Sequence, residues 1–270
     1  MITKRDEEIL KFINFFGKTY TKVLEKTFFP SFSSAENRVA NLKKQDIISF
    51  WNTNLVSPRR AIVLSESTKN YFERHLDIKV KKTKIHLSTI EHNIIEQITF
   101  FWLQKIGEVK RTVVFNDSKD LNHTPDFILF SQEKKINIEI EITKKTEKRY
   151  KEIIFKSVKD GADYMLYVLR KKEDVKSFAE YMPRSNKLMF IDIDSLIFNI
   201  KTTGKISPIF QEELLFYDEV WVKIFNSNYV FNYGKSIWFL NSYLFTIVKV
   251  TKKAVSELGR YLFFYLNPNI

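Results

Sequence analysis

The chain of 270 residues contains no cysteine and only six glycines and six prolines. The lack of cysteine excludes disulfides, zinc–thiolate sites, iron–sulfur clusters and cysteine nucleophiles. The few glycines and prolines exclude a collagen-like or linker-dominated chain. The longest uncharged apolar run, residues 236–248, is too short to span a bilayer, and the charged start lacks the apolar core of a signal peptide. These absences predict a cytoplasmic protein that makes no membrane contact.

The chain has an excess of positive charge, a formal net of +12, and 44% hydrophobic residues, which suffice for a packed core. Residues 1–86 carry 17 Lys+Arg against 9 Asp+Glu, whereas residues 87–270 carry 27 against 23. Two thirds of the excess therefore lie in the first third of the chain, which favours a polyanionic partner such as nucleic acid there. The alternative is a biased proteome, because Lys, Asn, Ile and Phe are all plentiful.

Residues 1–86 follow the pattern of a winged helix-turn-helix domain. Apolar residues spaced i, i+3, i+4 and i+7 indicate amphipathic helices, and alternating apolar residues indicate strands. The predicted elements are, in order, a helix over 6–16 ending at Gly17, a second short helix capped by Thr19, a third helix over 34–44, strands over 47–51 and 60–64, and a helix over 67–75. The loop between the two strands is the predicted wing.

The side chains predicted to contact DNA lie on the third helix and at the end of the wing. Amides and cations share one face of that helix, and these are the side chains that bond base edges and phosphates in a major groove. The wing arginines are suited to backbone phosphates. The predicted DNA-binding residues are Asn37, Arg38, Asn41, Lys44, Arg59 and Arg60. The alternative is a winged helix used for protein contacts.

Residues 87–270 are predicted to form a second domain of the α+β or α/β class. The order helix, strand, hairpin of two strands, helix, strand predicts a mixed sheet flanked by helices. The predicted elements are helices over 88–102, 146–159, 173–181 and 256–265 and strand-like segments over 110–115, 126–130, 136–143, 164–169, 188–193, 220–225, 229–233 and 236–248.

Three acidic residues are predicted to meet on this sheet. The strand 136–143 alternates strictly, with isoleucines on one face and polar residues, Glu139 and Glu141 among them, on the other. Asp126 begins the neighbouring strand of the hairpin. The mutual repulsion of three carboxylates predicts a bound divalent cation, Mg²⁺ or Mn²⁺, which polarises a phosphodiester. The alternative is an ordinary half-exposed strand, with Asp126 capping the entry turn.

Pro125–Asp126, followed after a spacer of 12 residues by Glu139–Ile–Glu141, resembles the active-site motif of the PD-(D/E)xK nuclease superfamily, the restriction-endonuclease-like fold. Glu141 stands where the superfamily usually has Lys. The resemblance implies that Asp126 and Glu139 hold the metal ion and that Glu141, with the ion, deprotonates the attacking water.

The same resemblance implies two further residues of the site. Lys144 is the first candidate for the missing cation and Lys145 the second, since both end the acidic strand. A metal-binding Glu is implied on the first helix of the fold, where Glu91 is the first choice and Glu96 the second. A general base at His123 and a covalent mechanism through one of the twelve tyrosines stay open.

The whole arrangement over residues 4–170 is similar to the replication-relaxation family of plasmid proteins and to MOBC-type relaxases. The segments on which this resemblance is based are the winged helix, Thr-Pro-Asp, Ile-Glu-Ile-Glu-Ile-Thr-Lys-Lys and Lys-Arg-Tyr in the next helix. The resemblance implies an enzyme that binds an origin-type site in double-stranded DNA and nicks it, as a homodimer or with relaxosome proteins. The alternative is a catalytically inactive DNA-binding accessory of the relaxosome or a transcriptional regulator.

Overall fold

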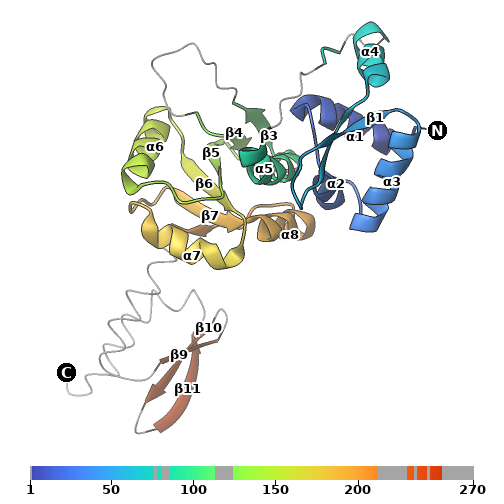
Figure 1. Cartoon of the computed structure of the whole chain (residues 1–270). Helices are drawn as coiled ribbons and strands as arrows, with labels where there is room; N and C mark the ends of the chain where they lie inside the picture. Colours follow the sequence, from blue (N-terminus) through green and yellow to red (C-terminus); the bar gives the residue numbers. More distant parts are fainter. Residues whose placement is uncertain are drawn as a thin grey trace. The chain divides into compact units, whose positions relative to one another are not determined.

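A computed structural model shows a mixed α+β protein with helices packed on a mixed sheet (Figure 1). It describes residues 2–75, 78–80, 86–112, 124–211, 230–233, 236–241 and 244–250. His123, part of the predicted strand 110–115, the segment 220–225 and the helix 256–265 lie outside the described residues. Met1–Gln211 form one compact unit and Glu212–Ile270 a second. In the second unit, β9 (Val230–Tyr233), β10 (Ser236–Asn241) and β11 (Leu244–Val250) pair as an antiparallel sheet.

The first unit begins with three helices, a hairpin and a fourth helix, as the sequence predicts. The elements are α1 (Lys4–Phe16), α2 (Thr21–Thr27), α3 (Phe32–Lys44), β1 (Ile48–Asn52), β2 (Arg60–Leu64) and α4 (Glu66–His75). Gly17 ends α1 because its φ of 76° lies in the left-handed region that glycine adopts without strain. The capping prediction for Thr19 is wrong. Thr19 exchanges two backbone hydrogen bonds with Ile62 of β2, each 2.8 Å long, and Tyr20 occupies the N-cap position of α2 instead.

The second part of the same unit is a six-stranded sheet with helices between its strands. The elements are a 3₁₀ turn (Leu87–Thr89), α5 (Ile90–Leu103), β3 (Glu108–Arg111), β4 (Phe127–Ser131), β5 (Lys134–Glu141), α6 (Glu147–Lys159), β6 (Tyr164–Leu169), α7 (Lys172–Tyr181), β7 (Leu188–Asp192), α8 (Ile193–Thr203) and β8 (Ile209–Phe210). The strands lie in the order β3-β4-β5-β6-β7-β8. The strands β3, β4 and β5 are antiparallel neighbours, whereas β5, β6 and β7 run parallel.

Both faces of this sheet are covered, so its central strands are buried on both sides. The isoleucine face of β5 packs with α5 and α8, through residues such as Ile138, Ile140, Ile98 and Ile197. On the opposite face, aromatic side chains of α6, β6, α7 and β7 contact one another; the set comprises Tyr150, Tyr167, Phe178 and Phe190. The carboxylates of β5 therefore belong to an enclosed layer rather than to a solvent-exposed sheet face.

The N-terminal helices and the sheet share one hydrophobic core. Phe12 and Phe16 of α1 belong to the same buried cluster as Leu103 of α5 and Phe127 of β4. The Trp102 indole donates a hydrogen bond of 3.1 Å to the carbonyl of Lys26 in α2. The boundary predicted at residue 86 thus does not coincide with the boundary between the two compact units, which lies after Gln211. Because the shared core fixes α1 and α2 on α5, the hairpin and the acidic strand have a fixed relation to each other.

Candidate active site and nucleic-acid interface

The carboxylates of Glu139 and Glu141 are buried in the middle of the sheet, with 4% and 5% exposure. Each lies opposite a residue of the parallel neighbour β6, Glu139 opposite Tyr167 and Glu141 opposite Leu169. A strand covered on both sides rarely carries two carboxylates, because burying a charge without a partner is costly. The half-exposed strand considered from the sequence is therefore excluded, and the burial of these two groups calls for a functional explanation.

Asp126 lies at the start of β4, directly beside the acidic strand. Phe127 pairs with Ile138, so the antiparallel register continued by one residue sets Asp126 opposite Glu139. The Asp126 carboxylate accepts a hydrogen bond of 2.7 Å from the backbone N–H of Ile140. Asp126 therefore also caps the entry into strand β4, which is the role that the alternative interpretation gives it. The same hydrogen bond directs the Asp126 carboxylate toward β5.

Of the two lysines that follow β5, only Lys145 reaches the acidic residues. Its Nζ forms an ion pair and a short hydrogen bond with Glu141, and its backbone N–H donates to the Tyr150 hydroxyl at 2.9 Å. The Nζ of Lys144 instead donates to the carbonyl of Ser177 in α7 at 3.1 Å, over the Tyr181 ring. The geometry thus favours the second candidate for the cation and not the first.

The pKa of the Glu141 carboxyl group is shifted upward despite its ion pair with Lys145. Burial raises the pKa of Glu141, the hydrogen bond and charge of Lys145 lower it, and the negative charge of Asp126 raises it again, with a net upward shift. A raised carboxyl pKa means that the charged form lies in an unfavourable site until a further cation arrives. Asp126 and Glu141 are therefore close enough to influence each other electrostatically.

Helix α5 places His92 and Glu96 beside Asp126, and of these only Glu96 was expected from the sequence. His92 Nε2 lies 3.5 Å from Asp126 Oδ2. Burial alone would lower the pKa of His92, but the hydrogen bond and charge of Asp126 and the charge of Glu96 outweigh it and raise the pKa. Glu96 is buried and paired with Arg111 at 2.7 Å. Burial is the main cause that raises the pKa of Glu96, and Asp126 adds to it.

The helix carboxylate beside Asp126 is therefore Glu96, the second choice from the sequence, and not Glu91. Glu91 lies on another side of α5, where it forms an ion pair with Arg170 directly after β6. Each of the two residues lies a few positions before an apolar residue of the α5 stripe, so the sequence alone does not show which carboxylate faces β4. Arg111 and His92 carry no motif of their own, so only the packing of α5 on β3 and β4 reveals them.

Asp126, Glu139 and Glu141 offer carboxylate oxygens, the ligand type that Mg²⁺ and Mn²⁺ prefer in proteins. Within the described ranges, no three His, Asp or Glu side chains are grouped closely enough to enclose a metal ion by themselves. Mg²⁺ is commonly held by one or two carboxylates, with water and substrate phosphate as the remaining ligands. The electrostatic coupling of Asp126 and Glu141 fits that kind of open site.

The exposed face of α3 carries Asn37, Asn41 and Lys44, all accessible to solvent. Arg38 is different. Its guanidinium binds the carboxylate of Asp6 in α1, with Nε 2.7 Å from Oδ1 and Nη2 bonded to Oδ2. In the structure the Arg38 side chain ties α3 to α1, and its contact with DNA stays a prediction.

The two wing arginines have no ion pair within the described part of the chain. Arg59 and Arg60 are both exposed, and the Arg60 guanidinium lies 4.4 Å from the centre of the Phe50 ring. This contact holds Arg60 beside the hairpin while leaving its charge accessible to a phosphate.

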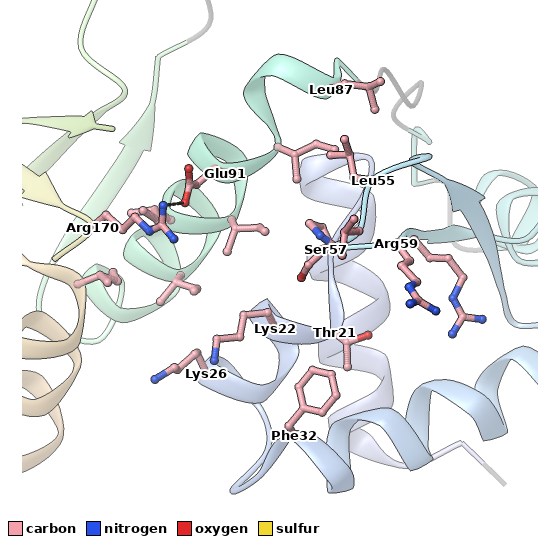
Figure 2. A pocket seen from close by; sticks show the side chains of 18 of the residues that line it. Thr21, Lys22, Lys26, Phe32, Leu55, Ser57, Arg59, Leu87, Glu91 and Arg170 are labelled. Carbon is pink, nitrogen blue, oxygen red and sulfur yellow. Dashed lines mark ion pairs between the residues drawn. The ribbon is translucent and has the colours of Figure 1, made fainter. Parts of the chain in front are cut away.

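A cleft of about 1040 Å³ opens between the β1–β2 loop, the predicted wing, and the helices α5 and α8, and α2 also lines it (Figure 2). One wall carries Lys22 and Lys26 of α2 together with the wing residues 55–60, and the other carries Glu91 and Arg170. The ion pair of Lys26 with Asp194, 3.1 Å long, bridges the two walls.

Comparison of the chain with protein-family models, with curated proteins and with solved structures finds no match. A functional assignment therefore depends on the residues and the fold described above. No helix within the described residues is both long and apolar enough to cross a membrane.

Proposed function

We propose that this protein is a DNA-binding, metal-dependent endonuclease, in which a winged helix positions a PD-(D/E)xK-like site. The observation that carries the proposal is the pair of buried carboxylates on β5, beside Asp126 and with Lys145 on Glu141. The order α5-β3-β4-β5-α6-β6 supports it, because it is the helix, strand, hairpin, helix and strand that the motif resemblance implies.

The division of labour follows from where the charges lie. Asn37, Asn41 and Lys44 of α3 would read a duplex in its major groove, while Arg59 and Arg60 would hold the phosphate backbone. The whole-chain resemblance points to an origin-type site of a plasmid or mobile element. The shared core would keep the acidic strand in register with the bound duplex.

In this proposal Asp126 and Glu139 hold the divalent cation, whose chemistry is to polarise the phosphodiester and acidify a bound water. The Ile140 N–H and His92 orient Asp126 toward β5. Glu141 accepts the proton of the attacking water, because burial raises its pKa and so makes it a stronger base than an exposed carboxylate. The Lys145 ammonium offsets the negative charge that grows on the phosphate as the bond breaks.

One observation favours a second function, a DNA-binding accessory or regulator without nuclease activity. Lys145 already neutralises Glu141, and the Ile140 N–H already occupies one oxygen of Asp126. A carboxylate set satisfied within the chain is also what a purely structural role requires.

Nicking of supercoiled plasmid by the full chain, with Mn²⁺, with Mg²⁺ and with chelator, separates the two functions. The nuclease proposal expects metal-dependent nicking that Glu139→Gln abolishes while duplex binding is retained. Glu152→Gln, a surface carboxylate paired with Arg149 on α6, is the matched control and should nick like wild type. Duplex binding without nicking in any metal would leave the accessory role, and full nicking by Glu139→Gln would overturn the proposed site.

A further inference from the structure

We propose that the cleft between the wing and α5 binds a single DNA strand and leads it toward the acidic strand. This inference rests on the proposed function, since it concerns how DNA reaches the same site. It assigns DNA contacts to Lys22, Phe32 and Arg170, none of which lies on the exposed face of α3 described above.

The charge of the cleft suits a polyanion. Its lining contains five cations, Lys22, Lys26, Arg59, Arg60 and Arg170, against three acids, Glu36, Glu91 and Asp194. Three of the cations form ion pairs, Lys22 with Glu25, Lys26 with Asp194 and Arg170 with Glu91. The wing arginines keep their charge for a ligand, and phosphates of a passing strand are the groups that such a lining attracts.

The cleft also offers apolar surface for bases. Val56 is 89% exposed, Leu87 51% and Phe32, at the start of α3, 46%. Figure 2 shows the Phe32 ring beside Thr21, on the same side of the cleft as the lysines of α2. An exposed ring next to cations is the arrangement on which single-stranded bases stack without sequence preference.

The size of the cleft selects a single strand over a duplex. Its volume, about 1040 Å³, is at the upper end of pockets that hold drug-sized ligands, which leaves room for a few nucleotides. A DNA duplex is larger, because its major groove alone is about 12 Å wide and accommodates a whole α-helix. The shared core also fixes α2 against α5, two of the helices that line the cleft.

The first turn of α5 lies between the cleft and Asp126. Arg170 follows Leu169, which lies opposite Glu141 in the register of β5 and β6. On α5, Glu91 faces the cleft and contacts Arg170, whereas the next residue, His92, faces Asp126. Asp126, Glu139 and Glu141 do not line the cleft themselves, and the first turn of α5 links the two places, because Glu91 contacts Arg170 and His92 contacts Asp126.

The test is binding of a fluorescent oligothymidylate of about ten nucleotides to the full chain, measured by anisotropy in chelator at several salt concentrations. Wild type should bind with a steep salt dependence. Arg170→Glu should weaken binding and flatten the slope by about 0.7 for the lost phosphate contact. Phe32→Ala should weaken it about tenfold, the effect of one lost base stack. Glu91→Gln, which frees Arg170, should strengthen it.

Matched controls separate these effects from general loss of charge or apolar surface. Arg149→Glu breaks an equivalent surface ion pair on α6, and Phe155→Ala removes an exposed ring of the same helix, so both should bind like wild type. Asn41→Ala should weaken duplex binding and leave oligothymidylate binding unchanged, so that failure of the duplex assignment is distinguishable from failure of this one.

Equal oligothymidylate binding by wild type, Arg170→Glu and Phe32→Ala would overturn the proposal. Competition by polyglutamate as effective as competition by unlabelled oligothymidylate would also overturn it, because the cleft would then bind any acidic chain. Loss of nicking with retained strand binding would refute the nuclease mechanism and leave the cleft assignment intact.

Discussion

Replacing Arg38 by alanine tests whether this residue serves the fold rather than the DNA. Asp6 is 1% exposed, and its carboxylate accepts bonds from the Thr3 N–H at 2.6 Å, the Thr3 hydroxyl at 2.7 Å and the Arg38 guanidinium. Arg38→Ala removes the only cation from this carboxylate among the residues described. The free energy of unfolding should therefore fall, through a buried charge left without its partner.

The expected loss is about 3 kcal/mol, the lower end of the range for removing one partner of a buried pair, because the two Thr3 bonds remain. With about 2–4 °C of melting temperature per kcal/mol for a domain of this size, the shift is about 6–12 °C. Asn41→Ala, an exposed residue on the same helix, is the control and should stay within about 0.5 kcal/mol of wild type. Thermal and urea unfolding measure both values.

The pH dependence of stability tests independently whether the ion pair of Asp6 with Arg38 stabilises the fold. Burial raises the pKa of Asp6, but the hydrogen bonds from Arg38 and Thr3 outweigh it and lower the pKa. The stabilisation is therefore complete above the unfolded-state pKa, about 3.9, and is lost as the pH falls through the lower folded-state pKa. The difference in stability between wild type and Arg38→Ala should shrink over that acidic range. Asp6→Asn in the Arg38→Ala background should recover part of the loss. If Arg38→Ala proved as stable as the Asn41→Ala control and yet bound DNA less tightly, the reasoning would be refuted.

Three further predictions concern the site and the interface. Lys145→Met should remove most of the nicking rate and Lys144→Met little, since only Lys145 contacts Glu141; the opposite ranking in the plasmid assay would restore the first candidate. Mn²⁺ or Mg²⁺ should raise the melting temperature of wild type by mass action but not that of Asp126→Asn, and identical shifts in a thermal scan would argue against the metal site. Asn41→Ala should cost about 1–3 kcal/mol at the preferred duplex, whereas Arg59→Ala should weaken binding to every duplex and lower the salt slope by about 0.9. Titrations at two salt concentrations distinguish these two patterns, and unchanged binding by both variants would contradict the interface.

Local patterns determined the element types of this protein. The apolar spacing of α1 and its stop at Gly17 are fixed within one stretch of chain, because a helix face and a left-handed glycine are local properties. The alternation of β5 and the cap of α8 by Asp192, which accepts from the Ser195 N–H at 2.9 Å, are local in the same sense. The pairing of Asp126 with β5 also followed from sequence, because a hairpin brings its strands into register.

Only the tertiary structure decided which side chains meet. The choice of Lys145 over Lys144 depends on how the chain turns between β5 and α6, and the choice of Glu96 over Glu91 depends on the rotation of α5 against β4. Arg38 binds Asp6 because α1 crosses α3, a contact between residues 32 positions apart. Side-chain direction within one element is set by its period, but the partner is set by packing between elements, which no local pattern encodes.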